Sequence, residues 1–430
     1  MHTNSPTWSV YCGGWGDLEE QSAPLARVPY LNDVPACLTL KGCGVKKVAS
    51  LQQGAQGAVY AARDPTVSGG EGEANVAVKR LFTQQNEYGR HGIAETVLRE
   101  VSLLRYMTAE QQRHVSLPMD DSARPIRLLR VVEAPHHELC MVVELCALDL
   151  RRIVIQRSAA GGARRCPRLA NVATVKYLLR RLVRMVHFLH RDCRIAHRDL
   201  KLSNVLVTRT GELRLSDFGS ARFLVSRGES SSAVEYTPTA HRTTLLYQPL
   251  ECLYGDRSGA TAVDMWSLGV MFAELVLQRH LFTSGSELAM IGAIQKLLGD
   301  EAAAAAAAPF TVTAAGAPAH EATLALKFPP SVLPAEGLDL LRGLLRTDPA
   351  RRLTVEQVVQ HPFLAAGALE EQAGAAEWTA AVREALERKE EVVTVRMPGL
   401  AGAPGWGAAA DLDEEDDDDD DVVVPLAFGA

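Results

Sequence analysis

Up to about residue 145 the chain consists mostly of short apolar runs without a longer repeat. Residues 76–78 and 140–143 are rich in β-branched and other apolar side chains, a composition typical of buried strands. Residues 96–107 differ, because apolar side chains recur there every three or four positions, as on one face of a helix. The pattern over residues 42–145 therefore predicts a small β-rich lobe with one helix.

Helical spacing dominates after residue 146. Residues 172–190 carry enough apolar side chains for a buried helix, and residues 264–277 and 338–345 show a similar pattern. We therefore expect a larger, mainly α-helical lobe over residues 146–365 and an α+β fold class for the two lobes together. A functional cleft is expected at their junction.

The segments outside the two lobes have the composition of poorly ordered chain. Residues 1–41 mix Gly, Pro and polar residues without a sustained period, and an Ala-rich stretch at about 301–320 is expected to be a surface insertion. Residues 366–430 are expected to be a mostly disordered tail in which 375–391 could form a helix. The tail contains an acidic run, 411–421, whose charges repel one another.

This acidic run dominates the net charge. The chain has a formal net charge of −7, and the run holds ten acids and no base, so the remaining residues together carry +3. The hydrophobic content of 47% and charged content of 23% are typical of a soluble globular protein. No apolar run approaches the ~18 residues that span a bilayer. The first thirty residues lack the pattern of a signal peptide.

The eight cysteines are scattered, without a Cys-x-x-Cys pair or a histidine cluster that would indicate zinc. Reduced thiols in an intracellular protein are therefore expected. We expect no membrane partner and no direct nucleic-acid partner.

One eight-residue segment carries the side chains of a phosphoryl-transfer site. It runs from His197 to Asn204, and Asp217 opens an Asp-Phe-Gly tripeptide thirteen residues after Asn204. Asp199 can accept or orient a hydroxyl proton, and Lys201 can lie against the transferred group. Asn204 and Asp217 can hold magnesium ions. A solvated charged loop does not explain the full spacing, which indicates transfer of the ATP γ-phosphate to a hydroxyl.

Two features upstream are typical of phosphate binding. Residues 52–60 are similar to a glycine loop, in which small residues let backbone N–H groups approach phosphate oxygens, although Gln52 replaces the usual first glycine. Lys79 ends the run 76–78, and Glu100 in the following predicted helix is placed to pair with it. Alone, the glycines are equally explained by an ordinary turn, and Lys79 by a surface lysine. The order of the two features along the chain favours phosphate binding.

Together these motifs resemble those of a eukaryotic protein kinase, over roughly residues 42–365. Glu251 stands where the family has the glutamate of Ala-Pro-Glu. Asp264 matches the buried aspartate that braces the catalytic loop, and Arg352 matches the arginine that pairs with the Glu251 position. The resemblance implies a two-lobed protein-kinase fold, and Lys201 indicates its serine/threonine form.

The resemblance also implies how ATP and Mg²⁺ are held. Backbone groups of Glu144 and Cys146 contact adenine, with Val143 as a small gatekeeper that is also explained by core packing. The implied catalytic residues are Asp199, Lys201 and Asn204, and the implied metal ligands are Asn204 and Asp217. The other residues implied to surround the nucleotide are Leu51, Gly54, Gly57, Val59, Ala77, Lys79 and Glu100.

Within this family the chain resembles cyclin-dependent kinases. Residues 92–100 are similar to their cyclin-contacting helix, and residues 286–299 to the helical insert of the wider group. Residues 236–238 (Tyr-Thr-Pro) and 201–204 resemble the PITSLRE-type members. The resemblance implies protein substrates, a cyclin-like regulatory subunit and a location in the nucleus, the cytoplasm or both.

Thr239 occupies the position of the activating phosphothreonine of cyclin-dependent kinases, which an upstream kinase modifies. The family uses three arginines to bind that phosphate, and Arg99, Arg198 and Arg222 stand at those positions. Thr237 before Pro238 is a second candidate, and an unmodified loop is the remaining alternative.

Some positions depart from the family pattern. His241 stands where mitogen-activated kinases need tyrosine, which argues against that branch. Gln248 replaces an arginine that shapes the pocket for proline after the target residue, so a preference for Ser/Thr-Pro sites stays open. A cyclin-independent kinase and a pseudokinase scaffold, the latter motivated by Gln52 and residues 248–250, are the alternatives. The intact chemical positions argue against the pseudokinase.

Overall fold

A computed structural model shows the fold of the chain. It describes residues 38–39, 45–54, 57–67, 74–81, 84–85, 91–92, 95–111, 123–134, 138–155, 171–226, 235–236, 244–256, 260–299, 323–365, 367–395 and 424–425. The Ala-rich insertion, the acidic run and the N-terminal extension apart from 38–39 lie outside these ranges, so the predictions for them stay untested.

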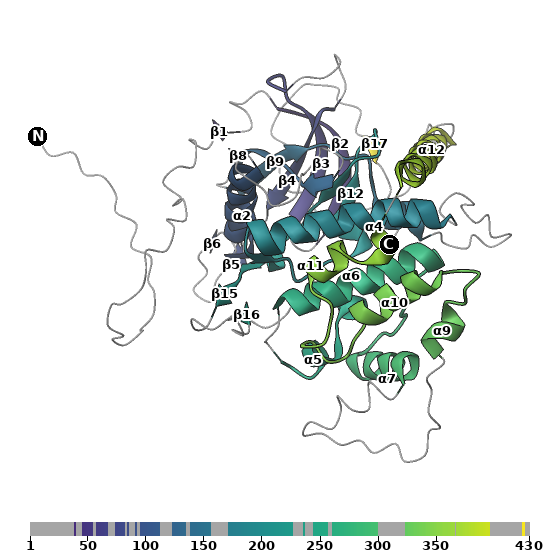
Figure 1. Cartoon of the computed structure of the whole chain (residues 1–430). Helices are drawn as coiled ribbons and strands as arrows, with labels where there is room; N and C mark the ends of the chain where they lie inside the picture. Colours follow the sequence, from purple (N-terminus) through teal and green to yellow (C-terminus); the bar gives the residue numbers. More distant parts are fainter. Residues whose placement is uncertain are drawn as a thin grey trace, which may run out of the picture. The chain divides into compact units, whose positions relative to one another are not determined.

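The main sheet of the smaller lobe has the strand order β1-β8-β9-β4-β3-β2-β17 (Figure 1). The five central strands are antiparallel, and β1 and β17 each pair parallel with a neighbour. Val76 and Val78 pack on one face and Ala77 on the other, as the two-residue period of a strand requires. The predicted buried strands are therefore confirmed. The bounds are β1 Leu38–Thr39, β2 Lys46–Gly54, β3 Gly57–Arg63, β4 Val76–Leu81, β8 Leu128–Ala134, β9 Glu138–Glu144 and β17 Val424–Pro425.

Helix α2 (Glu95–Gln111) packs beside this sheet against β8 (Figure 1). Its side chains at Val97, Val101, Leu104 and Met107 are buried, and they belong to the same core as Ala77. The helix predicted over residues 96–107 is confirmed, with one more residue at its start and four more at its end.

The larger lobe is built around α4 (Val172–His187) and α6 (Ala260–Leu277), which pack on each other. The Asn171 side chain caps α4 by accepting a hydrogen bond from the Ala173 N–H at 3.0 Å. A Cβ at Gly269 would lie 2.9 Å from the Leu344 and Leu345 side chains, so only glycine lets α10 (Ala335–Leu344) approach α6 this closely. The predicted helices are confirmed. The remaining helices of this lobe are α3 Leu150–Val154, α5 Leu250–Leu253, α7 Glu287–Leu298, α9 Thr323–Lys327, α11 Val355–Val359 and a π-helical turn, Phe188–Asp192, that extends α4.

A second sheet, in the order β10-β12-β13-β7, carries the functional segments. Strands β12 (Val205–Val207) and β13 (Leu213–Leu215) form its central hairpin, and β13 also pairs parallel with β7 (Ala123–Pro125). Asn204 directly precedes β12 and Asp217 follows β13, so the hairpin brings these two residues to one end. The other short strands are β5 Gln84–Gln85, β6 His91–Gly92, β10 Leu148–Asp149, β11 Ile195–Ala196, β14 Arg222–Phe223, β15 Val225–Ser226 and β16 Glu235–Tyr236, and the 3₁₀ turns are Leu202–Asn204, Phe218–Ser220, Leu245–Tyr247 and Pro362–Leu364.

The fold continues beyond the boundary that the sequence placed at residue 365. Where mostly disordered tail was expected, the structure has a 28-residue helix, α12 (Ala368–Val395), which packs on α4. The suggested helix at 375–391 lies inside it. Trp378 is 1% exposed and joins the main core, together with Ala381 and Val382. Within the described residues, no helix has both the length and the apolar content needed to cross a membrane.

Candidate active site

The segment from His197 to Asn204 is a buried loop held by Asp264 on α6. The Asp264 carboxylate accepts hydrogen bonds from the backbone N–H of His197 at 2.8 Å and of Arg198 at 2.7 Å, and it contacts His190 Nε2 at 2.8 Å. Burial would raise the pKa of Asp264, but the contact with His190 and the N–H donors hold this pKa below its usual value. The ionised carboxylate thereby fixes Arg198 in its left-handed conformation, with φ 68°.

Asp199 stands at the centre of the predicted catalytic residues. Its Oδ2 accepts a hydrogen bond from Lys201 Nζ at 2.7 Å, and its Oδ1 accepts from the Thr244 hydroxyl at 2.7 Å and the Thr244 N–H at 2.9 Å. Asn204 Nδ2 donates to the Asp199 carbonyl at 2.9 Å. Although burial acts to raise it, the pKa of Asp199 is lowered by Lys201 and the hydrogen bonds from Thr244. The carboxylate is therefore ionised near neutral pH.

Thr244 is a site residue that the sequence interpretation missed. Its hydroxyl joins Asp199 to Lys201, because it donates to Asp199 at 2.7 Å and accepts from Lys201 at 2.9 Å. A hydroxyl in the sequence does not reveal which residue it contacts. In the structure Thr244 directly precedes the turn Leu245–Tyr247, and its place before the Leu-Leu-Tyr sequence was the one feature that could have indicated it.

The predicted metal ligands lie together at the end of the β12–β13 hairpin. The Asn204 carbonyl accepts hydrogen bonds from Ser216 N at 2.8 Å and Ser216 Oγ at 2.9 Å, which joins it to the residue before Asp217. Asp217 has a left-handed conformation, with φ 63°. Because the nitrogen of the Asn204 amide is bound to the Asp199 carbonyl, its oxygen faces away from that carbonyl. An amide oxygen and a carboxylate are the hard ligands that suit Mg²⁺.

Lys79 and Glu100 form the predicted pair across β4 and α2. Lys79 Nζ lies 2.9 Å from Glu100 Oε1 and 2.8 Å from Oε2. Burial would lower the pKa of Lys79, but the charges of Glu100 and Asp217 raise it above its usual value, so Lys79 stays an ammonium. Asp217 therefore belongs to the same electrostatic group, and Arg99 on α2 donates to the Gly219 carbonyl at 3.1 Å.

The other positions predicted to surround the nucleotide lie on neighbouring strands. Ala77 is paired with Val143 across β4 and β9, and both are buried. Val59 on β3 is the partner of Lys79, and Leu51 on β2 is half-buried. Gly54 and Gly57 face each other where β2 meets β3, on either side of residues 55–56, which are outside the described residues.

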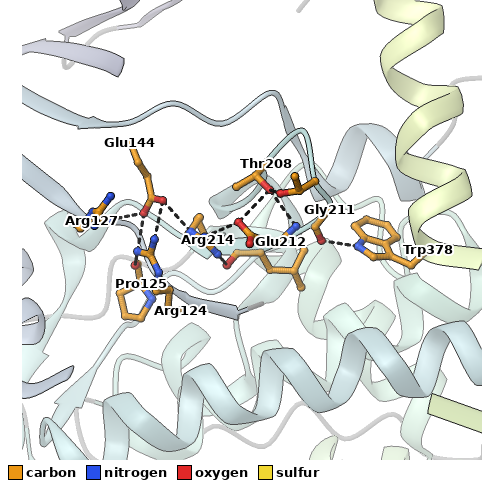
Figure 2. Close-up of polar contacts among 11 residues, drawn as sticks. Arg124, Pro125, Arg127, Glu144, Thr208, Gly211, Glu212, Arg214 and Trp378 are labelled. Atoms are coloured by element: carbon orange, nitrogen blue, oxygen red, sulfur yellow. Dashed lines mark hydrogen bonds and ion pairs between the residues drawn. The ribbon is translucent and has the colours of Figure 1, made fainter. Parts of the chain in front are cut away.

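Glu144, at the end of β9, is held through its side chain by three groups (Figure 2). Arg124 donates to both carboxylate oxygens at 2.7 and 2.9 Å, Arg214 Nε donates to Oε2 at 2.9 Å, and the Arg127 N–H donates to Oε1 at 2.7 Å. Burial acts to raise the pKa of Glu144, but Arg214 and the other donors hold it below its usual value. Burial and the charge of Glu144 raise the pKa of the neighbouring Cys146 to about 12, so that thiol is protonated at neutral pH.

The three predicted phosphate-binding arginines are close enough to repel one another. Burial, together with the charges of Arg222 and Arg99, lowers the pKa of Arg198 to about 10, against the opposing charge of Asp264. A cluster of like charges favours binding of an anion. Thr237 and Thr239, the candidate phosphorylation sites, lie outside the described residues.

Glu251 and Arg352 form the predicted structural pair. Arg352 Nη1 donates to Glu251 Oε1 at 2.7 Å and Nη2 donates to Oε2 at 3.1 Å. Arg352 also donates to the carbonyls of Ala262 and Arg346. Its side chain is 0% exposed and that of Glu251 is 7% exposed, so the pair is a buried part of the scaffold.

Residues 45–364 match the family model described as protein kinase domain. The chain therefore belongs to the protein kinase family, and the predicted two-lobed kinase fold is confirmed. Within the described residues no three His, Cys, Asp or Glu side chains gather as in an all-protein metal site.

Among named relatives, the chain is similar to cyclin-dependent kinases, as the sequence predicted. It is 31% identical over 326 residues to cyclin-dependent kinase G1 of Arabidopsis thaliana, covering 74% of this chain and 48% of the relative. The chain thus spans about half the length of that relative. It is 29% identical over 334 residues to cell division control protein 2 homolog 1 of Trypanosoma brucei brucei, covering 75% of this chain and 98% of the relative.

A solved structure of the CAK complex from Chaetomium thermophilum bound to ATP-γ-S contains a similar chain. The identity is 26% and the TM-score is 0.56, with 74% of this chain and 90% of that chain covered.

Proposed function

We propose that the chain is a serine/threonine kinase of the cyclin-dependent type, which transfers the γ-phosphate of ATP to protein hydroxyl groups. The observation that carries this proposal is the group formed by Asp199, Lys201, Asn204 and Thr244. Asp199 accepts the proton of the substrate hydroxyl, and Thr244 and Lys201 hold its two oxygens in place. Lys201 also carries the positive charge that stabilises the transferred group.

The other site residues have binding roles in this proposal. Lys79, fixed by Glu100, binds the ATP phosphates, and main-chain groups of Glu144 and Cys146 bind adenine. Asn204 and Asp217 hold Mg²⁺, which neutralises phosphate charge when bound. The donor chemistry of these two side chains and their position at one end of the hairpin support that assignment.

Regulation follows from the arginine cluster and α2. Phosphate on Thr239, added by an upstream kinase, binds Arg99, Arg198 and Arg222, and because Arg198 adjoins Asp199 the phosphate orders the catalytic loop. A cyclin-like subunit binds α2 and keeps Glu100 on Lys79. We place the protein inside the cell, in the nucleus or cytoplasm.

The test is phosphorylation of Ser, Thr and Tyr peptides, with and without proline after the target, by the full chain in the presence of Mg²⁺ and ATP. We expect labelling of Ser and Thr only, increased at least about tenfold by phosphate at Thr239. Thr239→Ala should remove the increase and Thr237→Ala should not. Tyrosine labelling contradicts the serine/threonine assignment, and ATP binding without any transfer identifies a pseudokinase.

The cyclin proposal has a separate test. The side chain of Glu95 is 85% exposed at the start of α2, where a partner would contact it. Glu95→Arg should weaken capture of a cyclin-box protein by about tenfold, whereas Lys296→Arg on the exposed side of α7 should leave capture unchanged. Full activity of the purified chain together with no cyclin-box partner supports the cyclin-independent alternative instead.

A further inference from the structure

Helix α12 is attached to α4 by a close and specific contact. A Cβ at Gly374 would lie 2.6 Å from the Ala173 carbonyl oxygen and 2.8 Å from Tyr177 Cβ, so the two helices cross where only glycine fits. Acidic side chains of α12 bind donors on α4 and on its capping residue, Asn171, around this point. The pairs are Glu370 with Lys176 at 2.9 Å, Glu371 with Arg180 at 2.6 Å and Arg181 at 2.8 Å, and Glu377 with Thr174 at 2.5 Å and Asn171 at 2.7 Å.

The position of α12 fixes Trp378 on the turn between β12 and β13. The buried indole Nε1 donates to the Gly211 carbonyl at 2.6 Å. Gly211 has φ +89°, and a Cβ there would lie 3.2 Å from Trp378 Nε1, so the indole lies directly on the turn. A neutral hydrogen bond this well shielded from water holds the turn in one conformation.

From this turn, polar contacts continue to Glu144 (Figure 2). The Glu212 N–H donates to the Thr208 hydroxyl at 3.0 Å, which closes the turn. The Glu212 carboxylate accepts from Arg214 Nη2 at 2.7 Å, and Arg214 Nε donates to Glu144 at 2.9 Å. The Arg214 side chain is 3% exposed, so it is held between two carboxylates. The series of contacts connects α12 to the residue whose main chain is expected to bind adenine.

We propose that α12 is a positioning element of the kinase site, in which Trp378 fixes the β12–β13 turn and so fixes Arg214 on Glu144. The proposal rests on the kinase function proposed above. The same hairpin ends in Asn204 and Asp217, so its placement affects nucleotide binding at both the adenine and the metal end. Trp378 touches neither, and it acts through the turn.

Trp378→Phe keeps an aromatic side chain but removes the N–H donor. In the full chain we expect the KM for ATP to rise about two- to tenfold, the factor that one hydrogen bond is worth, while kcat changes less than about twofold. Glu212→Gln, at a half-exposed position, should raise the KM similarly without disturbing the core. The double variant should raise the KM for ATP by less than the product of the two single-variant increases, because both changes interrupt the same series of contacts from Trp378 to Glu144.

Leu369→Ser is the matched control, because Leu369 lies on the same helix, is 83% exposed and leaves Trp378 in place. Its KM should equal that of the unaltered protein. A purely structural role for Trp378 would lower the fraction of active protein and leave the KM unchanged.

The dissociation constant for ATP, measured by calorimetry on each protein, separates the two proposals. If the unaltered chain transfers no phosphate, the kinase function is contradicted. The dissociation constants for ATP then still test the positioning role. Unchanged ATP constants and KM values in both Trp378→Phe and Glu212→Gln overturn the positioning role alone. If Trp378→Phe is insoluble, Glu212→Gln decides.

Discussion

Replacement of Asp199 by asparagine is expected to lower kcat by about 10²–10⁴-fold, the usual contribution of a positioned general base. Asparagine has nearly the same shape as aspartate, so the contact with Thr244 can persist. It cannot accept a proton, and it removes the negative charge that holds Lys201 at 2.7 Å. Affinity for ATP should change little, because Lys79, Asn204 and Asp217 are unaltered.

The measurement is steady-state phosphorylation of the best Ser or Thr peptide, together with the dissociation constant for ATP. Asp339→Asn makes the same chemical change at a side chain that is 78% exposed on α10, and its kcat should be unaffected. An Asp199→Asn protein with undiminished phosphotransfer would falsify the catalytic assignment.

Replacement of Arg352 by methionine is expected to reduce the free energy of unfolding by about 3–5 kcal/mol, since it leaves the buried Glu251 carboxylate without its partner. Two backbone carbonyls, of Ala262 and Arg346, also lose their donor. This change should therefore be the most destabilising of the substitutions considered for this protein.

Urea denaturation followed by circular dichroism measures this loss. The double variant Glu251→Leu with Arg352→Met removes both charges and should recover part of the stability. Arg351→Met, at the exposed neighbouring position, should stay within about 0.5 kcal/mol of the unaltered protein. A loss below that size for Arg352→Met would show that the buried pair is not needed.

The elements with strong local patterns were predictable from the sequence. The apolar spacing of residues 96–107 and 172–190 depends on one buried face, and the structure has α2 and α4 there. Contacts within the catalytic segment were predictable because its residues are adjacent in sequence. The pair of Lys79 with Glu100 was predictable although 21 residues separate them, because Lys79 ends a predicted strand and Glu100 lies on the helix that follows it.

The packing of α12 on α4 was not predictable in the same way. Few of its described side chains are buried, chiefly Trp378, Ala381 and Val382. The donors for its acids lie on α4, 190 residues earlier for the Glu371–Arg181 pair. An alanine-rich, charged segment followed by an acidic run has the composition of a solvated tail. Tertiary contacts show that the segment belongs to the folded domain, among them the hydrogen bond from Trp378 to Gly211, 167 residues apart, and the ion pairs with α4.

The arginine contacts around Glu144 were missed for a related reason. Arg124, Arg127 and Arg214 lie on three separate strands or connections, and no spacing in the sequence links them to Glu144. The sequence interpretation assigned Glu144 a main-chain role alone. Its side-chain contacts depend on the pairing of β7 with β13, which brings Arg124 and Arg214 together.

The crossing of α12 over α4 at Gly374 determines where the chain can be shortened. A fragment that ends at residue 365 would expose the face of α4 that includes Ala173 and Tyr177, and Arg181 would lose the Glu371 carboxylate. An uncovered apolar surface promotes self-association. Fragments chosen by the limits of the family match would therefore purify as aggregates, whereas fragments extended to residue 395 would stay monodisperse.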